Sequence, residues 1–258
     1  APSLLQALLP EASDAQLASL RVVLCGGEAL SAELSRQLQQ RWSGRLINLY
    51  GPTEATIDTS SHEVPVDPAG PIVAIGKPID NVRTYVLSEA FEPCPPGAAG
   101  ELYIGGDSLA RGYHLRPGMT AERFIPDPFA SRSGARLYRT GDLVRYRQDG
   151  VIDYIGRIDH QVKIRGLRIE LGEIEARLLA LDGVREAMVL AQGNAGAQVL
   201  VAYIIAAAGD LQPAPLREQI RAGLKGNLPD YMVPAHLLFL EQWPLTVNGK
   251  LDRKALPL

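Results

Sequence analysis

Residues 20–54 read LRVVLCGGEALSAELSRQLQQRWSGRLINLYGPTE, and this stretch decides the fold class. A run rich in β-branched residues at 20–24 ends in glycines, and a second apolar run covers 45–50. Between the two runs Ser31 is a good helix N-cap, and apolar residues recur behind it at helical spacing: Leu34, Leu38 and Trp42. The order strand, helix, strand with glycine-rich exits predicts a βαβ unit with parallel strands.

Two short polar segments follow the predicted strands at their carboxyl ends, where α/β folds usually bind ligands. They are GGEA at 26–29 and GPTE at 51–54. A Thr-Glu pair alone is most simply a polar turn. The neighbouring residues favour a ligand site over a simple turn. Glycines let the backbone approach a ligand, and an aromatic ring offers a stacking face. A hydroxyl can donate to phosphate, and a carboxylate suits Mg²⁺. These groups come from Gly27, Gly51, Tyr50, Thr53 and Glu54. Together they indicate a nucleotide triphosphate site.

The composition is that of an ordinary soluble protein with room for two globular units: 258 residues, 46% hydrophobic and 21% charged. A net charge of -3 gives no electrostatic reason to expect nucleic acid or an anionic membrane as partner. The two cysteines, Cys25 and Cys94, are far apart and lack metal-ligand spacing. The start lacks the basic flank of a signal peptide, and the longest apolar run, 199–208, is too short to cross a bilayer. We therefore expect a cytoplasmic protein.

The remaining chain divides into a β-rich stretch and a smaller α+β stretch. Short alternating runs cut by glycine, proline and Asp-Gly turns fill 64–155 and predict a barrel-like or meander sheet. After residue 159 the pattern restarts with a hairpin centred on Arg165-Gly166 and an amphipathic helix from Leu171. Two strand-like runs, a helix and a last strand-like run follow, at 184–190, at 199–205, from 215 and at 236–240.

Three more polar clusters carry candidate chemistry, each beside a simpler interpretation. YRTGD at 138–142 places Asp142 at a predicted strand end, where it could accept two ribose hydroxyls or form an Asx-type turn. GRIDHQVKIRG at 156–166 gathers cations at the predicted boundary between units, or is a solvated face. NGKLDR at 248–253 presents Lys250 on a tight turn, where most lysines have no special role.

All these segments, in this order, resemble the adenylate-forming enzymes, and within them the amino-acid-activating adenylation domains of nonribosomal peptide synthetases. The matching segments are NLYGPTEAT (48–56), GELYIGGDSLARGYHLRPGMTAERF (100–124), YRTGDLVR (138–145), GRIDHQVKIRGLRIELGEIE (156–175), LPDYMVP (228–234) and NGKLDRKAL (248–256). They span nearly the whole chain and, as an ordered set, are highly specific.

The resemblance implies a fold of mixed class, α/β and α+β. Residues 1–158 would form the C-terminal part of a large α/β plus β-barrel lobe, and 159–258 a small mobile α+β lobe with the hinge at Asp159. The family's phosphate loop and the Asp that holds the substrate's amino group are not found in the sequence. The chain as given is therefore not expected to be a competent enzyme alone.

The resemblance assigns the adenine of ATP to the first lobe. It implies that Gly27, Glu28 and Ala29 line the base, that Asn48 faces its amino edge and that Tyr50 stacks on it. These roles agree with the chemistry of the residue types.

The phosphates and ribose are assigned to the same lobe. Thr53 would touch the α-phosphate and Glu54 would hold Mg²⁺. Asp142 would bind both ribose hydroxyls, with Tyr154 and Arg157 nearby.

The implied reaction is attack of an amino-acid carboxylate on the α-phosphorus of ATP, followed by transfer of the acyl group to the phosphopantetheine thiol of a peptidyl carrier domain. Lys250 would act with Thr53 and Glu54 in the first step. Rotation about Asp159 would then withdraw Lys250 and bring in the hairpin that contains Lys163 and Gly166, whose lack of a side chain leaves room for the pantetheine arm. A condensation domain and a small helper protein are further partners that the resemblance admits.

Substrate choice follows from the positions that match the family's pocket, which are Leu24, Gly26, Leu49, Ile57 and Asp58. They predict a roomy apolar pocket with one carboxylate, which needs a cationic or hydroxyl partner. We expect an amine-bearing or hydroxylated side chain, as in ornithine, hydroxyornithine or serine, and a place in secondary metabolism such as siderophore synthesis.

Two alternatives stay open at the level of sequence. An acyl- or aryl-CoA ligase shares the chemistry and transfers the acyl group to free coenzyme A. A non-catalytic docking lobe is the alternative from a different class, since the phosphate loop is not found in the sequence.

Overall fold

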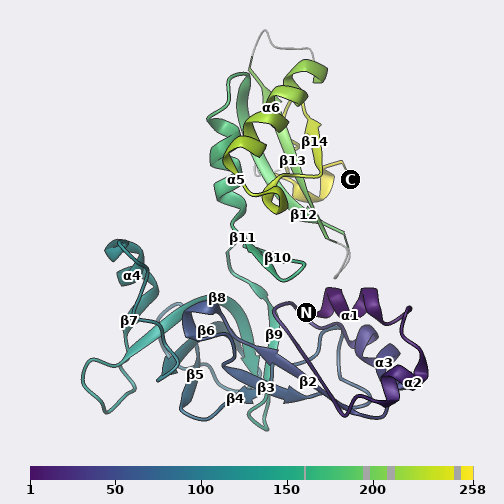
Figure 1. The fold of residues 1–258 in the computed structure, drawn as a ribbon. Helices are drawn as coiled ribbons and strands as arrows, with labels where there is room; N and C mark the ends of the chain where they lie inside the picture. The colour runs from purple at the N-terminus through teal and green to yellow at the C-terminus, as the bar shows by residue number, and fades with distance from the viewer. Residues whose placement is uncertain (160, 194–197, 208–212, 247–250, 258) are drawn as a thin grey trace. The chain divides into compact units, whose positions relative to one another are not determined.

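The computed structural model describes residues 1–159, 161–193, 198–207, 213–246 and 251–257. The chain forms two compact units, Ala1–Asp159 and His160–Leu258 (Figure 1). Among the described residues no helix combines the length and apolarity that crossing a membrane requires.

The first unit begins with the predicted βαβ arrangement. Strand β1 (Val22–Gly26) pairs in parallel with β2 (Arg45–Tyr50), and helix α3 (Ala32–Arg41) connects them. The predicted cap is confirmed, because the Ser31 hydroxyl accepts a hydrogen bond from the Leu34 amide at 3.2 Å. The first strand starts two residues later than the apolar run suggests. Parallel pairing places the carboxyl ends of β1 and β2, and the polar segments that follow them, at one edge of the sheet.

Further elements extend and cover this sheet. Antiparallel strands continue it in the order β1-β2-β3-β4, with β3 at Ser60–Glu63 and β4 at Lys77–Pro78. The N-terminal helices are α1 (Pro2–Leu8) and α2 (Asp14–Ala18). One core joins the helical segments to the sheet, and its buried members include Leu9, Leu17, Cys25, Leu38, Trp42 and Leu46.

A second, antiparallel sheet fills the β-rich stretch and confirms the prediction for it. Its strands are ordered β5-β6-β8-β7, and β9 pairs with the C-terminal half of β8, on the same edge as β7. The bounds are β5 Val82–Leu87, β6 Ala99–Gly106, β7 Phe124–Pro126, β8 Arg136–Tyr146 and β9 Ile152–Arg157, with the short helix α4 at Pro117–Arg123. Buried residues of both sheets share a core that includes Tyr50, Ile75, Leu102, Val144 and Ile152.

The prediction that residues 138–142 lie at a strand end is wrong. Residues 138–142 do not end a strand but lie in the middle of the long strand β8. Opposite β6 the register passes from Tyr103↔Arg139 to Glu101↔Leu143, so β8 carries extra residues at this point. Such a bulge bends the strand and re-aims its side chains. Gly141 supplies the left-handed backbone that the bulge requires, with φ of +74°.

The second unit is the predicted small α+β body. Hairpin β10 (Val162–Ile164) and β11 (Leu167–Ile169) turns at Arg165 and Gly166, whose φ values of 53° and 76° fit a tight hairpin turn. The other elements are α5 (Leu171–Leu179), β12 (Val184–Gln192), β13 (Val199–Ala206), α6 (Pro213–Asn227) and β14 (His236–Phe239).

Alternation along β13 gives this unit two cores. Leu200, Ala202 and Ile204 face the side of the sheet that α5 and α6 cover. The alternate residues Val201 and Tyr203 pack with Leu256 and the C-terminal segment on the other side. Period-two alternation in a sheet that is covered on both faces explains the nearly continuous apolar run of 199–205.

Candidate functional site

Glycines at the carboxyl edge of the first sheet are required by close backbone approaches. A Cβ on Gly51 would lie 2.2 Å from the Ile57 carbonyl oxygen, because the loop after β2 folds back on itself. The Thr59 amide closes this loop by donating to the Tyr50 carbonyl at 2.7 Å. A Cβ on Gly26 would lie 2.8 Å from the Leu49 carbonyl oxygen. Both glycines thus shape the edge from which the candidate residues project.

Thr53 and Glu54 lie in a short 3-10 helix, Thr53–Ala55, inside this loop. The Thr53 side chain is exposed, whereas Glu54 is buried. Tyr113 donates its hydroxyl hydrogen to Oε1 of Glu54 at 2.6 Å. Burial and this bond to Glu54 raise the pKa of Tyr113 well above its usual range, so the hydroxyl stays a donor at neutral pH.

Asn48 offers an acceptor for a ligand on the same sheet. Its side chain is buried, and its Nδ2 donates to the Ala74 carbonyl at 2.9 Å. Its Oδ1 is buried and accepts no hydrogen bond from any described residue. A buried acceptor without a donor is unusual in a folded protein and suits a ligand that brings an N–H group.

The positions predicted to select the substrate are all exposed or only partly buried. Gly26 and Leu49 are register partners, and Leu24 lies two residues before Gly26 on the same strand face. Leu24 and Ile57 are 61% and 70% exposed, and Asp58 is only half-buried. Ile57 also has a φ of 72°, which is rare for a β-branched residue and indicates strain in this loop.

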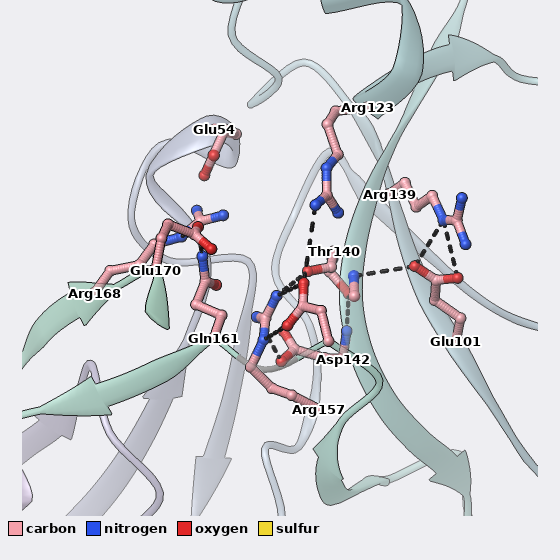
Figure 2. A network of polar contacts seen from close by, with 12 residues as sticks. Glu54, Glu101, Arg123, Arg139, Thr140, Asp142, Arg157, Gln161, Arg168 and Glu170 are labelled. Carbon is pink, nitrogen blue, oxygen red and sulfur yellow. Dashed lines mark hydrogen bonds and ion pairs between the residues drawn. The ribbon is translucent and has the colours of Figure 1, made fainter. Parts of the chain in front are cut away.

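The strongest polar network centres on Arg157 at the end of β9. Its Nη1 donates to Oδ1 of Asp142 at 3.0 Å and its Nη2 to the Thr140 carbonyl at 3.0 Å (Figure 2). Its Nε and Nη2 also donate to the two carboxylate oxygens of Asp159, at 2.6 and 2.7 Å. Although burial opposes the charged form, the carboxylates of Asp159 and Asp142 raise the pKa of Arg157 above its usual range. One guanidinium therefore holds two carboxylates from different places in the chain.

Tyr50 joins this network from the first sheet, because its hydroxyl donates to Oδ2 of Asp142. Burial, followed by the charge of Asp142, raises the pKa of Tyr50 well above its usual range. The same two causes raise the pKa of Tyr154, which lies on β9 opposite Val144. Asp142 is thereby held among protonated phenols and a guanidinium, and its carboxylate is the kind of acceptor that binds hydroxyl donors.

The bulge itself is held by Glu101. The Gly141 amide donates to Oε1 of Glu101 at 3.1 Å, and Arg139 donates to the same carboxylate at 3.0 Å. A cavity of about 520 Å³ lies beside the bulge, and its lining includes Glu101, Arg123, Arg139, Gly141 and Asp159. Arg123 approaches Asp159 to 3.8 Å there.

The structure brings together some predicted site residues and not others. Tyr50, Asp142, Arg157 and Asp159 are linked directly. Glu28, in the loop with Gly27 and Ala29, instead accepts a hydrogen bond from the Ser3 amide at 2.9 Å.

The rest of the predicted set belongs to the other end of the chain. Lys163 and Gly166 lie in the hairpin of the second unit. Lys250 falls outside the described residues. Nothing in the described chain tests the role assigned to any of the three.

Sequence reasoning missed Tyr113 and Glu101 as functional supports. Both lie in the segment 100–124, whose pattern matches the family, although no residue in it was given a role. Their contacts join segments far apart in sequence, so only the family motif could have pointed to them.

Comparisons with known proteins show the family of the chain. The model of the AMP-binding enzymes matches residues 1–114, and that of the AMP-binding enzyme C-terminal domain matches 173–250. Over 257 residues the chain is 50% identical to tyrocidine synthase 3 of Brevibacillus parabrevis, covering 99% of this chain and 4% of that protein. The chain belongs to the AMP-binding enzymes, as part of an adenylation domain of the nonribosomal peptide synthetase type.

Solved structures resemble this adenylation domain over nearly its whole length. Holo-PA1221, an NRPS protein containing adenylation and PCP domains bound to a vinylsulfonamide inhibitor, matches with a TM-score of 0.83 and 34% identity, covering 98% of this chain and 43% of that one. The Vibrio cholerae adenylation domain AlmE, in complex with glycyl-adenosine-5'-phosphate, matches with a TM-score of 0.83 and 30% identity, covering 98% and 47%. The fold predicted for the two lobes is thereby confirmed. The chain spans less than half of each of these chains and a small part of the synthetase.

Proposed function

We propose that the adenylation domain of which this chain is a part activates an amino acid with ATP and transfers it to the phosphopantetheine thiol of a carrier domain. The observation that carries the proposal is the Asp142 carboxylate, a buried acceptor-only group held on the β8 bulge by Tyr50 and Arg157. The ribose of a nucleotide supplies two adjacent hydroxyls. The AlmE complex, which holds an aminoacyl-adenylate on the same fold, supports the assignment.

The other residues of the first unit fit the rest of ATP. The buried Oδ1 of Asn48 suits the exocyclic amino group of adenine, which is an N–H donor. Thr53 is exposed, and its hydroxyl suits donation to a phosphate oxygen.

A single buried carboxylate, Glu54, fits Mg²⁺, which usually takes one or two carboxylates and completes its shell with phosphates and water. The described residues contain no cluster of three metal-ligating side chains that would hold an ion by themselves. Mg²⁺ bound with the phosphates would neutralise charge on them as the carboxylate attacks. Catalysis by the chain itself is then mostly positioning.

The substrate class is the finer part of the proposal. Asp58 is half-buried and follows Ile57 in the chain, and among the positions that match the family's pocket it is the one carboxylate, so it suits the amine or hydroxyl of an ornithine, hydroxyornithine or serine side chain. We test it with an amino-acid panel in ATP–pyrophosphate exchange on the full-length protein. Preference for ornithine, hydroxyornithine or serine would support Asp58 as the residue that selects the substrate. Preference for leucine, valine or phenylalanine would rule out this role for Asp58.

The thiol that receives the activated acyl group is identified in the same preparation. Loading of the carrier thiol with the activated acid supports the peptide-synthetase assignment. Loading of free coenzyme A instead would favour a CoA ligase, and no exchange with any amino acid would favour a docking lobe.

We further propose that Asp159 is the hinge about which the second unit reorients between the two half-reactions. The chain is anchored in the first unit up to this residue: the Ile158 amide donates to the Gly141 carbonyl at 2.9 Å, and Arg157 binds the Asp159 carboxylate. We expect Asp159→Pro to slow carrier loading much more than pyrophosphate exchange, because proline fixes φ near -65°. Asp159→Ala is the control, since it removes the same carboxylate and leaves φ free. Equal losses in both half-reactions for the proline variant would contradict a hinge at this residue.

A further inference from the structure

The segment 107–113, which we call the support segment, binds the turn that carries Thr53 and Glu54. Its Ala110 amide donates to the Glu54 carbonyl at 2.8 Å. The Thr56 hydroxyl donates to the Ser108 carbonyl at 2.7 Å. Tyr113 adds the contact to the Glu54 carboxylate at 2.6 Å. The backbone and the side chain of Glu54 are therefore both fixed by one short piece of chain.

The support segment is itself tied to the central strand β8. Arg136, at the start of that strand, donates through Nη1 to the Arg111 carbonyl and through Nη2 to the Ala110 carbonyl, both at 2.9 Å. The guanidinium also lies over the Phe124 ring, 5.2 Å from its centroid. A planar fork with several donors holds such a loop better than an ammonium group would.

Tyr113 is held from its other side by α4. Its amide donates to the Thr120 hydroxyl at 2.9 Å, and its ring packs edge-on against Phe124 with centroids 5.7 Å apart. The close approach of α4 requires Gly112, where a Cβ would lie 2.4 Å from Thr120 Cγ2. The amide bond thus holds the Tyr113 backbone, Phe124 supports its ring, and its hydroxyl reaches Glu54.

We propose that Tyr113 is a positioning residue that sets the orientation of the Glu54 carboxylate toward the divalent cation of the nucleotide complex. The inference rests on the proposed function, because it takes Glu54 as the cation's protein ligand. A donor fixed on Oε1 sets the plane of the carboxylate, and so sets the direction in which Oε2 points. Hydrogen bonds of this kind to ligating carboxylates commonly strengthen metal binding.

The test measures Mn²⁺ binding, by electron paramagnetic resonance, to the full-length protein saturated with a non-hydrolysable ATP analogue. We expect Tyr113→Phe to raise the Kd for Mn²⁺ about ten-fold, as is typical when such an outer partner is removed. Affinity for the analogue without metal should not change, which separates positioning from local unfolding.

Tyr146→Phe is the matched control. It also removes one partly buried phenol hydroxyl from the first unit, whose bond goes to the Thr84 carbonyl at 2.7 Å. This variant should bind Mn²⁺ as the wild type does. In a Glu54→Gln background, Tyr113→Phe should cause no further loss, because the ligand that it orients is already impaired.

Two results would overturn the inference alone: a Tyr113→Phe variant that binds Mn²⁺ as tightly as Tyr146→Phe, or one whose loss is the same with and without Glu54→Gln. A wild-type protein that binds no Mn²⁺ together with the nucleotide would overturn the proposed function, and the inference with it. The two failures are thus distinguished by the wild-type measurement.

Discussion

Arg157→Ala is expected to lower the free energy of unfolding of the β8–β9 region by about 3–5 kcal/mol, because it removes the guanidinium from a buried carboxylate. The side chains of Arg157 and Asp142 are only 10% and 5% exposed. The Thr140 carbonyl and the Asp159 carboxylate lose the same partner. Native-state hydrogen exchange of the β8 and β9 amides in the full-length protein measures the change locally.

Nucleotide affinity should fall in the same variant, since Asp142 would lose the bond that orients it. Arg145→Ala is the matched control, because its partner Asp153 lies on the same pair of strands while the arginine is 52% exposed. Such a surface pair contributes at most about 1 kcal/mol. Similar changes in exchange for the two variants would show that the Arg157 network does not hold this region together.

Lys250→Ala is expected to reduce adenylate formation by about 10²–10³-fold while ATP still binds. The reason is chemical: the resemblance places this ammonium where negative charge develops on carboxylate and phosphoryl oxygens during attack, and removing one such donor typically costs this much. Pyrophosphate exchange gives the rate, and titration with a non-hydrolysable analogue gives the affinity.

Lys254→Ala is the control for this prediction, because Lys254 is an exposed lysine only four positions away. Carrier loading from chemically supplied aminoacyl-adenylate should survive in Lys250→Ala, since the second half-reaction does not use this residue in our proposal. Exchange close to the wild-type rate would contradict the role assigned to Lys250.

The elements that sequence predicted well are those whose signal is local. Ser31 and the apolar spacing behind it predicted α3, and the hairpin at Arg165-Gly166 followed from turn chemistry and alternation. The bulge on β8 was missed because it depends on the register with β6, a strand about forty residues away in sequence. The local sequence pattern shows which residues form a strand. The register with the neighbouring strand decides where a bulge interrupts it.

The candidate site divides in the same way. Residue type and motif order were enough to single out Tyr50, Glu54, Asp142 and Arg157. They could not show that the Tyr50 hydroxyl donates to Asp142, that one guanidinium joins Asp142 to Asp159, or that Glu54 is held by Tyr113. These are contacts between side chains from distant segments, and the direction of a side chain depends on what packs against it.

By itself, then, the sequence determined the family, the βαβ unit, the elements of the small second unit, and the kinds of chemical group present at the edge of the first sheet. These follow from periodicity, capping and turn residues, which act over a few positions of the chain. Only the tertiary structure decided which carboxylates bind the same guanidinium and which carboxylate is oriented by a phenol hydroxyl. That choice depends on burial and on hydrogen bonds between strands, because a charged group removed from water is stable only where the fold brings it partners.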